Sequence, residues 1–171
     1  IGSVGAGRAV MKSAADTVKP VMLELGGKNA LIAFPDADPE AVADAMVAGM
    51  NFAWCGQSCG SCSRAFLHAS LHDRVLEALK VRIRAFRPGR PHDWNTTMGA
   101  IISQAQYDRV LSYIESGRAE GASLVCGGAA PAGLPGGFFI EPTVFAQVSP
   151  QMRIAREEIF GPVLSVLRWE D

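Results

Sequence analysis

Residues 30–68 read ALIAFPDADPEAVADAMVAGMNFAWCGQSCGSCSRAFLH, and this stretch decides the fold. The short apolar run over 30–34 predicts a buried strand, because strands of a parallel sheet are apolar on both faces. Asp38 followed by Pro39 is typical of a helix start, with the Asp side chain as cap and the proline in the first turn. Residues 64–68 predict a second strand. A strand, a helix and a second strand in this order indicate an α/β fold.

The alternation of helix and strand continues on both sides of this stretch. Ser70 is expected to cap the next helix, and Ser103 with Gln106 forms a capping box for another. Strands alternating with helices of this length predict a largely parallel sheet. The other expected elements are a helix over 4–17 and strands over 21–25, 123–126, 138–145 (interrupted at Pro142) and 163–169.

Composition excludes several classes of protein. The 171 residues hold 16 Lys and Arg against 17 Asp and Glu, so the chain is not a basic nucleic-acid-binding module. Its 49% of hydrophobic residues excludes a disordered acidic tail. No run approaches the ~18 apolar residues of a membrane span, and the opening Ile1-Gly2-Ser3 carries no secretory signal. We therefore expect a cytoplasmic protein without nucleic-acid or membrane partners, and an opening like this suggests the middle of a longer protein.

The four cysteines are unevenly spaced. Cys55, Cys59 and Cys62 lie close together and Cys126 stands apart, which is a poor disulfide framework. The spacing of the first three resembles the iron–sulfur signature of radical S-adenosylmethionine enzymes, but Ser61 stands where those motifs carry an aromatic residue. A zinc site would lack its fourth ligand. We expect no metal site, and we expect Cys55, Cys62 and Cys126 to be small buried side chains.

Four short strings stand out: Gly2-Ser3, Glu24-Leu25-Gly26-Gly27-Lys28, Gly56-Gln57-Ser58-Cys59 and Glu158-Ile159-Phe160-Gly161-Pro162. Each is weak by itself, because glycine-rich turns are common. In this order, with 35 residues from Glu24 to Cys59, they resemble the motifs of the NAD(P)-dependent aldehyde dehydrogenases. The resemblance covers essentially the whole chain.

The resemblance implies a three-layer α/β architecture divided between two domains. Residues 1–25 would be the C-terminal end of a Rossmann-like dinucleotide-binding domain. Residues 26–171 would be a catalytic domain that is incomplete at its C-terminus. It follows that the isolated 171 residues are expected to be inactive, and that the whole protein is expected to be a homodimer or homotetramer.

The resemblance also assigns the reaction. Cys59 would be the nucleophile, whose thiolate adds to an aldehyde to give a thiohemiacetal. Hydride transfer to NAD or NADP would leave an acyl-thioester, and Glu24 would act as general base for the water that hydrolyses it. Two alternatives stay open. The acyl group could be released to coenzyme A, or the chain could be a non-catalytic structural homologue.

The cofactor contacts implied by the resemblance come from five residues. Gly2 and Ser3 would bind phosphate at a helix N-terminus, where free N–H groups favour anions. Leu25 would offer its backbone to the nicotinamide amide, Glu158 would bind the nicotinamide ribose, and Phe160 would pack beside the ring.

Phe52 and Trp54 precede the cysteine string. They are expected to form an aromatic wall for an aryl or trimethylammonium aldehyde, and the alternative is that Trp54 is ordinary core at a helix end.

Overall fold

The computed structural model of the protein describes residues 1–134 and 136–170. Helices and strands alternate along this chain, which confirms the predicted α/β class. The helices are α1 (Val4–Ala15), α2 (Pro39–Met50), the 3-10 turn η1 (Phe52–Trp54), α3 (His72–Ile83), α4 (Gln104–Ala119) and α5 (Arg153–Arg156). The strands are β1 (Ala30–Ala33), β2 (Arg64–His68), β3 (Ser123–Cys126), β4 (Thr143–Ala146) and β5 (Val163–Trp169).

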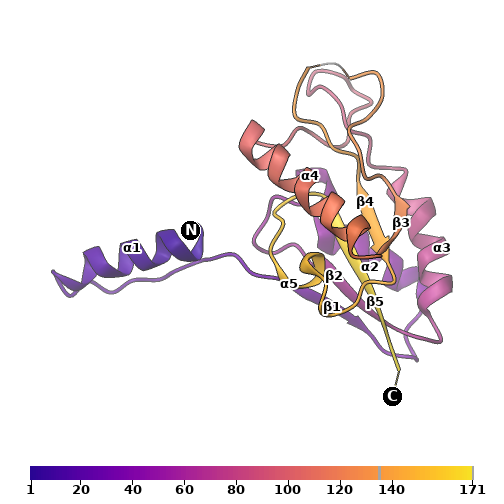
Figure 1. Ribbon diagram of the computed structural model, residues 1–171, viewed down its shortest axis with the longest axis horizontal. Helices are drawn as coiled ribbons and strands as arrows, with labels where there is room; N and C mark the ends of the chain where they lie inside the picture. Colours follow the sequence, from indigo (N-terminus) through magenta and orange to yellow (C-terminus); the bar gives the residue numbers. More distant parts are fainter. Residues whose placement is uncertain (135, 171) are drawn as a thin grey trace.

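The strands form one sheet in the order β1-β2-β5-β4-β3 (Figure 1). The pairs β1–β2, β2–β5 and β5–β4 are parallel, and only β3 runs antiparallel to its neighbour. The largely parallel sheet is therefore confirmed. The strand that comes last in the chain, β5, lies at the centre, and its entry loop consequently sits beside those of β1 and β2.

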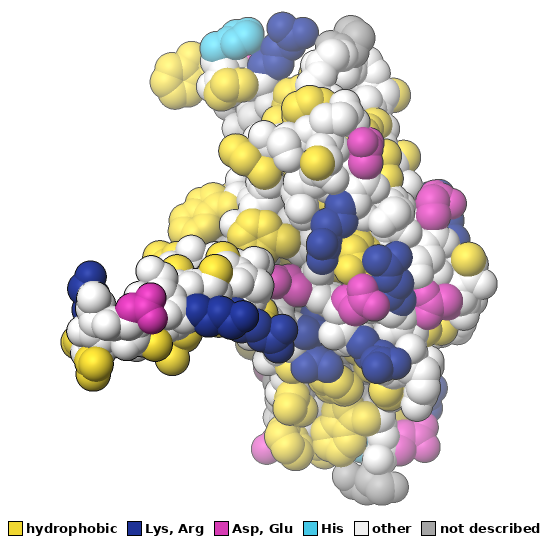
Figure 2. Space-filling view, turned by 60° about the vertical axis from the view of Figure 1, so that its left-hand side comes forward, with side chains coloured by type: hydrophobic (Ala, Val, Ile, Leu, Met, Phe, Trp, Pro, Cys, Tyr) yellow, Lys and Arg dark blue, Asp and Glu magenta, His cyan; other side chains and the backbone are white. Residues whose placement is uncertain are grey.

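Residues 1–25 stand clear of the rest of the molecule. In Figure 1 and Figure 2, α1 and the extended segment after it project sideways from the body as an arm. Gly7 is the single buried residue of α1. The strand expected over 21–25 is wrong, because only Leu25 finds a partner, in one isolated parallel bridge with Gly2.

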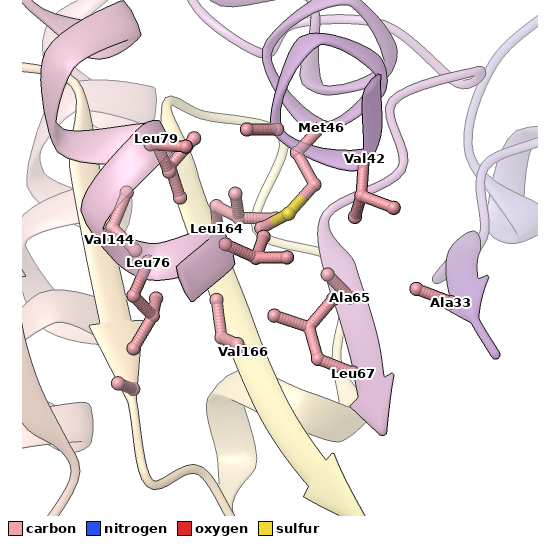
Figure 3. Packing of buried hydrophobic residues seen from close by; sticks show 14 of the residues in the cluster. Ala33, Val42, Met46, Ala65, Leu67, Leu76, Leu79, Val144, Leu164 and Val166 are labelled. Carbon is pink, nitrogen blue, oxygen red and sulfur yellow. The ribbon is translucent and has the colours of Figure 1, made fainter. Parts of the chain in front are cut away.

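The sheet is covered on both faces, so the molecule has three layers. In β5, Leu164 and Val166 pack beneath α2 and α3, whereas Val163 and Leu167 face α4 and α5. This alternation follows from the two-residue period of a strand. Figure 3 shows the first face, where Met46 of α2 lies over the strands together with side chains from α3.

Two local predictions concern helix starts. The side chain of Asp38 accepts hydrogen bonds from the N–H groups of Glu40 and Ala41, which confirms it as the cap of α2. The prediction that Ser70 caps α3 is wrong. Its hydroxyl bonds instead with Nδ1 of His68 at 2.8 Å, and Leu71 occupies the cap position without a side-chain bond.

Two strand predictions are corrected by tertiary position. The 30–34 run was expected to be buried, but β1 is an edge strand, with Ile32 and Phe34 both 59% exposed. The strand expected over 138–145 is restricted to β4, because Pro142 lacks the N–H that a ladder requires.

Within the described residues no helix combines the length and hydrophobicity needed to cross a membrane.

Candidate active site

Five of the predicted site residues, Glu24, Leu25, Cys59, Glu158 and Phe160, lie on three loops at one end of the sheet, whereas Gly2 and Ser3 lie on the arm (Figure 1). Loops 24–29, 56–63 and 157–162 lead into β1, β2 and β5, which are adjacent and parallel. The amino-terminal ends of neighbouring parallel strands lie at the same end of the sheet, so these three loops, which are far apart in the sequence, converge there. Ligands of open α/β sheets usually bind at the carboxyl ends of the strands, whereas this site lies at their amino ends.

The 24–29 segment contacts residues that were predicted to bind the cofactor. The N–H of Gly2 donates to the carbonyl of Glu24 at 3.0 Å, and Leu25 forms the bridge with Gly2. The N–H of Gly27 donates to Oε1 of Glu158 at 3.3 Å. Gly26 permits this approach, because a Cβ there would lie 2.1 Å from Oε2 of Glu158. The segment therefore brings four of the predicted residues together.

Ser3 and Phe160 are the other two predicted cofactor residues. Ser3 caps α1, its hydroxyl accepting from the N–H of Ala6 at 3.2 Å. Phe160 is 37% exposed and has a φ of +56°, which is unusual for a residue with a side chain.

Cys59 is the one cysteine of the four that is exposed. Its loop begins with Cys55 and Gly56 in the left-handed region, at φ +56° and +62°. Glycine is required at 56, because a Cβ would lie 2.3 Å from the carbonyl oxygen of Gly161. The sharp turn that follows carries Cys59 to the surface.

The other cysteines are chemically different. Cys55 is buried, as predicted, and burial raises the pKa of its thiol to about 11. Burial also raises the pKa of Cys126, but Cys126 and Cys62 are only half-buried, which corrects the expectation of full burial. All four are free thiols. Across residues 1–134 and 136–170, no group of three or more His, Cys, Asp or Glu side chains could hold a metal ion.

Glu24 is exposed, and its carboxylate has no hydrogen-bond or ion-pair partner among the described residues. The structure brings its segment next to the cysteine loop through the Asn29–Cys59 hydrogen bond, and the described residues show no hydrogen bond between the Glu24 carboxylate and Cys59.

Helix α4 holds the 157–162 loop, which sequence reasoning did not anticipate. Ser103 caps α4 by accepting from the N–H of Gln106, which is half of the predicted capping box. The Gln106 side chain does not return to Ser103. Its Nε2 donates to the carbonyls of Ile159 and Phe160, both at 2.9 Å, and so supports the left-handed backbone of Phe160.

Side chains from the next two turns of α4 form hydrogen bonds with the same loop. Arg109 donates to the carbonyl of Glu158 at 3.0 Å, and the hydroxyl of Tyr113 donates to Glu157 at 2.7 Å. Tyr113 and the guanidinium of Arg153 together hold the pKa of Glu157 below its usual range. The helical spacing of 106, 109 and 113 was the available signal, because such positions share one face.

The two aromatic residues before the cysteine loop separate. Phe52 is fully buried and packs against Phe86 with ring centroids 5.4 Å apart, so it belongs to the core. Trp54 is 67% exposed. The core alternative for Trp54 is therefore wrong, and so is the expectation that Phe52 forms part of an aromatic wall.

Lys28 is the buried charge of the site. Its Nζ is inaccessible and has no hydrogen-bond partner in the part of the chain that the structure describes. Burial, and to a lesser extent nearby Arg64, lower the pKa of its ammonium to about 8, although Glu158 acts in the opposite direction. A buried ammonium without hydrogen bonds is costly, so Lys28 destabilises the fold wherever it is charged.

Replacing Lys28 by Met should therefore raise the thermal unfolding midpoint of the whole protein at pH 7. The pKa of Lys28 is lower in the folded state than in the unfolded state, so the folded state binds fewer protons between pH ~8 and ~10.5. The free energy of unfolding therefore decreases as the pH falls through that window. We expect a gain of about 1–3 kcal/mol below pH 8 that disappears above pH 10.5. Lys12→Met, at an exposed site, is the control, and equal pH profiles for the two variants would contradict the prediction.

Comparison with known proteins agrees with this geometry. The sequence model described as the aldehyde dehydrogenase family matches residues 1–171. An aldehyde dehydrogenase, tropH, from Talaromyces stipitatus is 58% identical, and a betaine aldehyde dehydrogenase from Brucella ovis is 52% identical. The alignments cover 100% and 99% of this chain but 34% and 35% of those proteins. The chain thus spans about a third of the length of the curated relatives that it matches.

Solved structures show the same fold. An NAD-dependent aldehyde dehydrogenase from Sinorhizobium meliloti superposes with a TM-score of 0.92 at 44% identity, over 99% of this chain and 33% of that one. The NAD+ complex of an aldehyde dehydrogenase from Bacillus cereus gives 0.89 at 40% identity, over 99% and 34%. With its whole length matched by the family model, this chain belongs to the aldehyde dehydrogenase family.

Proposed function

We propose that the whole protein oxidises an aldehyde to a carboxylic acid with NAD+, using Cys59 as nucleophile and Glu24 as general base. The observation that carries this proposal is the position of Cys59. It is the exposed cysteine, and it lies on a loop that enters the sheet beside the segment bearing Glu24. The burial of Cys55 supports the choice, because its raised thiol pKa keeps the thiolate scarce.

The chemistry follows from these groups. The Cys59 thiolate adds to the carbonyl carbon, and neighbouring N–H groups stabilise the oxygen that becomes negative. Bound NAD+ supplies a hydride acceptor, so the carbon is oxidised and Cys59 carries an acyl-thioester. Glu24 removes a proton from water, which attacks the thioester, releases the acid and restores the thiolate. The exposed Trp54 supports an aromatic wall beside this cysteine, suited to an aryl or trimethylammonium aldehyde.

The residues present fit a dinucleotide. The N-terminus of α1, which follows Gly2 and Ser3, offers backbone N–H groups to phosphate, and the 24–29 segment joins this end to Glu158. Leu25, Glu158 and Phe160 would hold the nicotinamide riboside on the same surface. We propose NAD+ as the cofactor on the names of the relatives, and NADP+ remains the alternative.

We further propose the division at residue 25 expected from the sequence. The arm exposes large apolar side chains along α1 and the segment after it, which is typical of a surface that other elements cover. These side chains are Val4, Val10, Met11, Val18 and Met22. The isolated chain would then be inactive, and the expected homodimer or homotetramer stays a prediction.

Replacing Gly26 by Ala should weaken cofactor binding. The new Cβ would lie 2.1 Å from Oε2 of Glu158, so that carboxylate must move away from its position. We expect the KM for NAD+ to rise roughly tenfold, the cost of about one hydrogen bond to a charged group. Gly99→Ala is the control, because a Cβ there meets no atom within 4 Å. An unchanged KM in the Gly26 variant would remove Glu158 from the proposed site.

The test of the function is to assay the whole protein with NAD+ and a panel of aliphatic, aryl and trimethylammonium aldehydes. NADH formation with release of free acid, and no dependence on coenzyme A, supports the proposal. Acyl-coenzyme A as product would favour the acylating alternative. Absence of NADH with every aldehyde in the panel would favour the non-catalytic homologue and contradict the proposal.

A further inference from the structure

Asn29 directly contacts the cysteine loop. It lies between Lys28 and the first residue of β1, and its Nδ2 donates to the backbone carbonyl of Cys59 at 2.7 Å. Within the described residues, this is the single hydrogen bond that Cys59 makes. The main chain at the proposed nucleophile is therefore tied to one side chain.

The register of the sheet makes this contact possible. Ala30 pairs with Arg64 where β1 and β2 begin, so the residues before each strand face one another. Arg64 donates from Nε and from its terminal nitrogen to the carbonyl of Lys28, at 3.0 and 2.7 Å. The 24–29 segment and the chain around the start of β2 are thus joined by hydrogen bonds in both directions. Asn29 reaches forward to the cysteine loop, and Arg64 reaches back to the 24–29 segment.

The remainder of the cysteine loop is anchored elsewhere. The N–H of Cys62 donates to the carbonyl of Gly49 at 2.8 Å, and the side-chain oxygen of Gln57 accepts from the N–H of Ile102 at 2.9 Å. These bonds hold the two sides of the loop against α2 and the chain before α4. Between them, the turn that carries Cys59 is held by Asn29.

We propose that Asn29 is a positioning residue for Cys59. Its amide fixes the peptide unit that follows Cys59 and, through it, the direction in which the thiol leaves the backbone. This inference rests on the proposed function, because the direction of the thiol matters only if the thiol attacks a substrate. A neutral donor suits the position, since a carboxylate would repel the Cys59 carbonyl and place a negative charge beside the thiolate.

The contact is at the surface, so it can be removed without unfolding the protein. Asn29 is half-buried and Cys59 is exposed. Asn29→Ala removes the donor without adding charge, and Asn95→Ala is the matched control at an exposed position in another loop. Three measurements on the whole protein are needed: the thermal midpoint, hydrogen–deuterium exchange over 56–61, and the single-turnover rate of NADH formation.

We expect Asn29→Ala to exchange faster over 56–61 and to form NADH about 10-fold to 100-fold more slowly, with the KM for NAD+ and the thermal midpoint unchanged. Asn95→Ala should match the parent protein in all of these. Unchanged exchange, or faster exchange with an unchanged NADH rate, would overturn the proposal. A parent protein that forms no NADH would contradict the proposed function instead, while the exchange measurement would still report on the contact.

Discussion

Replacing Cys59 by Ala should abolish aldehyde oxidation by the whole protein, lowering kcat about 10⁴-fold or more. The nucleophile is the one group whose loss removes both covalent steps, and losses of this size accompany the removal of a nucleophile in other enzymes. The measurement is NADH formation with saturating aldehyde and NAD+. The KM for NAD+ should change little, because the thiol is not among the residues proposed to hold the dinucleotide.

Cys62→Ala is the matched control for that variant. It makes the same change three residues along the same loop, at a half-buried thiol. We expect it to keep most of the activity. Turnover that survives Cys59→Ala, with the fold intact, would contradict the assignment of the nucleophile and favour a non-catalytic role for the motif.

Replacing Glu24 by Gln should stop the reaction at the acyl-enzyme. Hydride transfer precedes hydrolysis, so a burst of NADH stoichiometric with Cys59 should remain, while steady turnover falls roughly 10²-fold to 10⁴-fold. The acyl group should then be detectable on Cys59 by mass spectrometry. This result would separate the two catalytic roles, since loss of the thiol removes the burst and loss of the carboxylate preserves it.

The control for Glu24 is Glu77→Gln, at an exposed carboxylate that pairs with Lys80 on α3. It should leave both burst and turnover unchanged. If Glu24→Gln turns over as fast as the parent protein with water as acceptor, the general base is another group. If it does so only with coenzyme A, the acylating alternative is favoured.

Local patterns predicted several elements correctly. Strands β2 and β5 begin and end where alternation and composition placed them, and Asp38 caps α2. These features depend on neighbours in sequence, so the chain encodes them directly. Ser70 failed as a cap because its hydroxyl has a competing partner in His68, which the pattern of small polar residues does not reveal.

Properties that depend on position in the sheet were less predictable. The apolar run of β1 reads as a central strand but lies at an edge. The apolar composition of a strand shows that the strand can be buried. It does not show which strands or helices pack against it in the described chain. In the same way, the capping-box pattern at Ser103 could not show that the Gln106 side chain holds the loop before β5.

By itself, the sequence determined the alternating elements, the family motifs and the choice of Cys59 and Glu24 as candidates, since these depend on residue chemistry and local spacing. Only the tertiary structure decided how the motifs meet. Glu158 reaches Gly27 across 131 residues because β5 inserts beside β2 in the sheet, and Asn29 reaches Cys59 across 30 residues because β1 pairs with β2. That insertion depends on burying both faces of β5 under two helical layers, an energy that no local stretch of sequence contains.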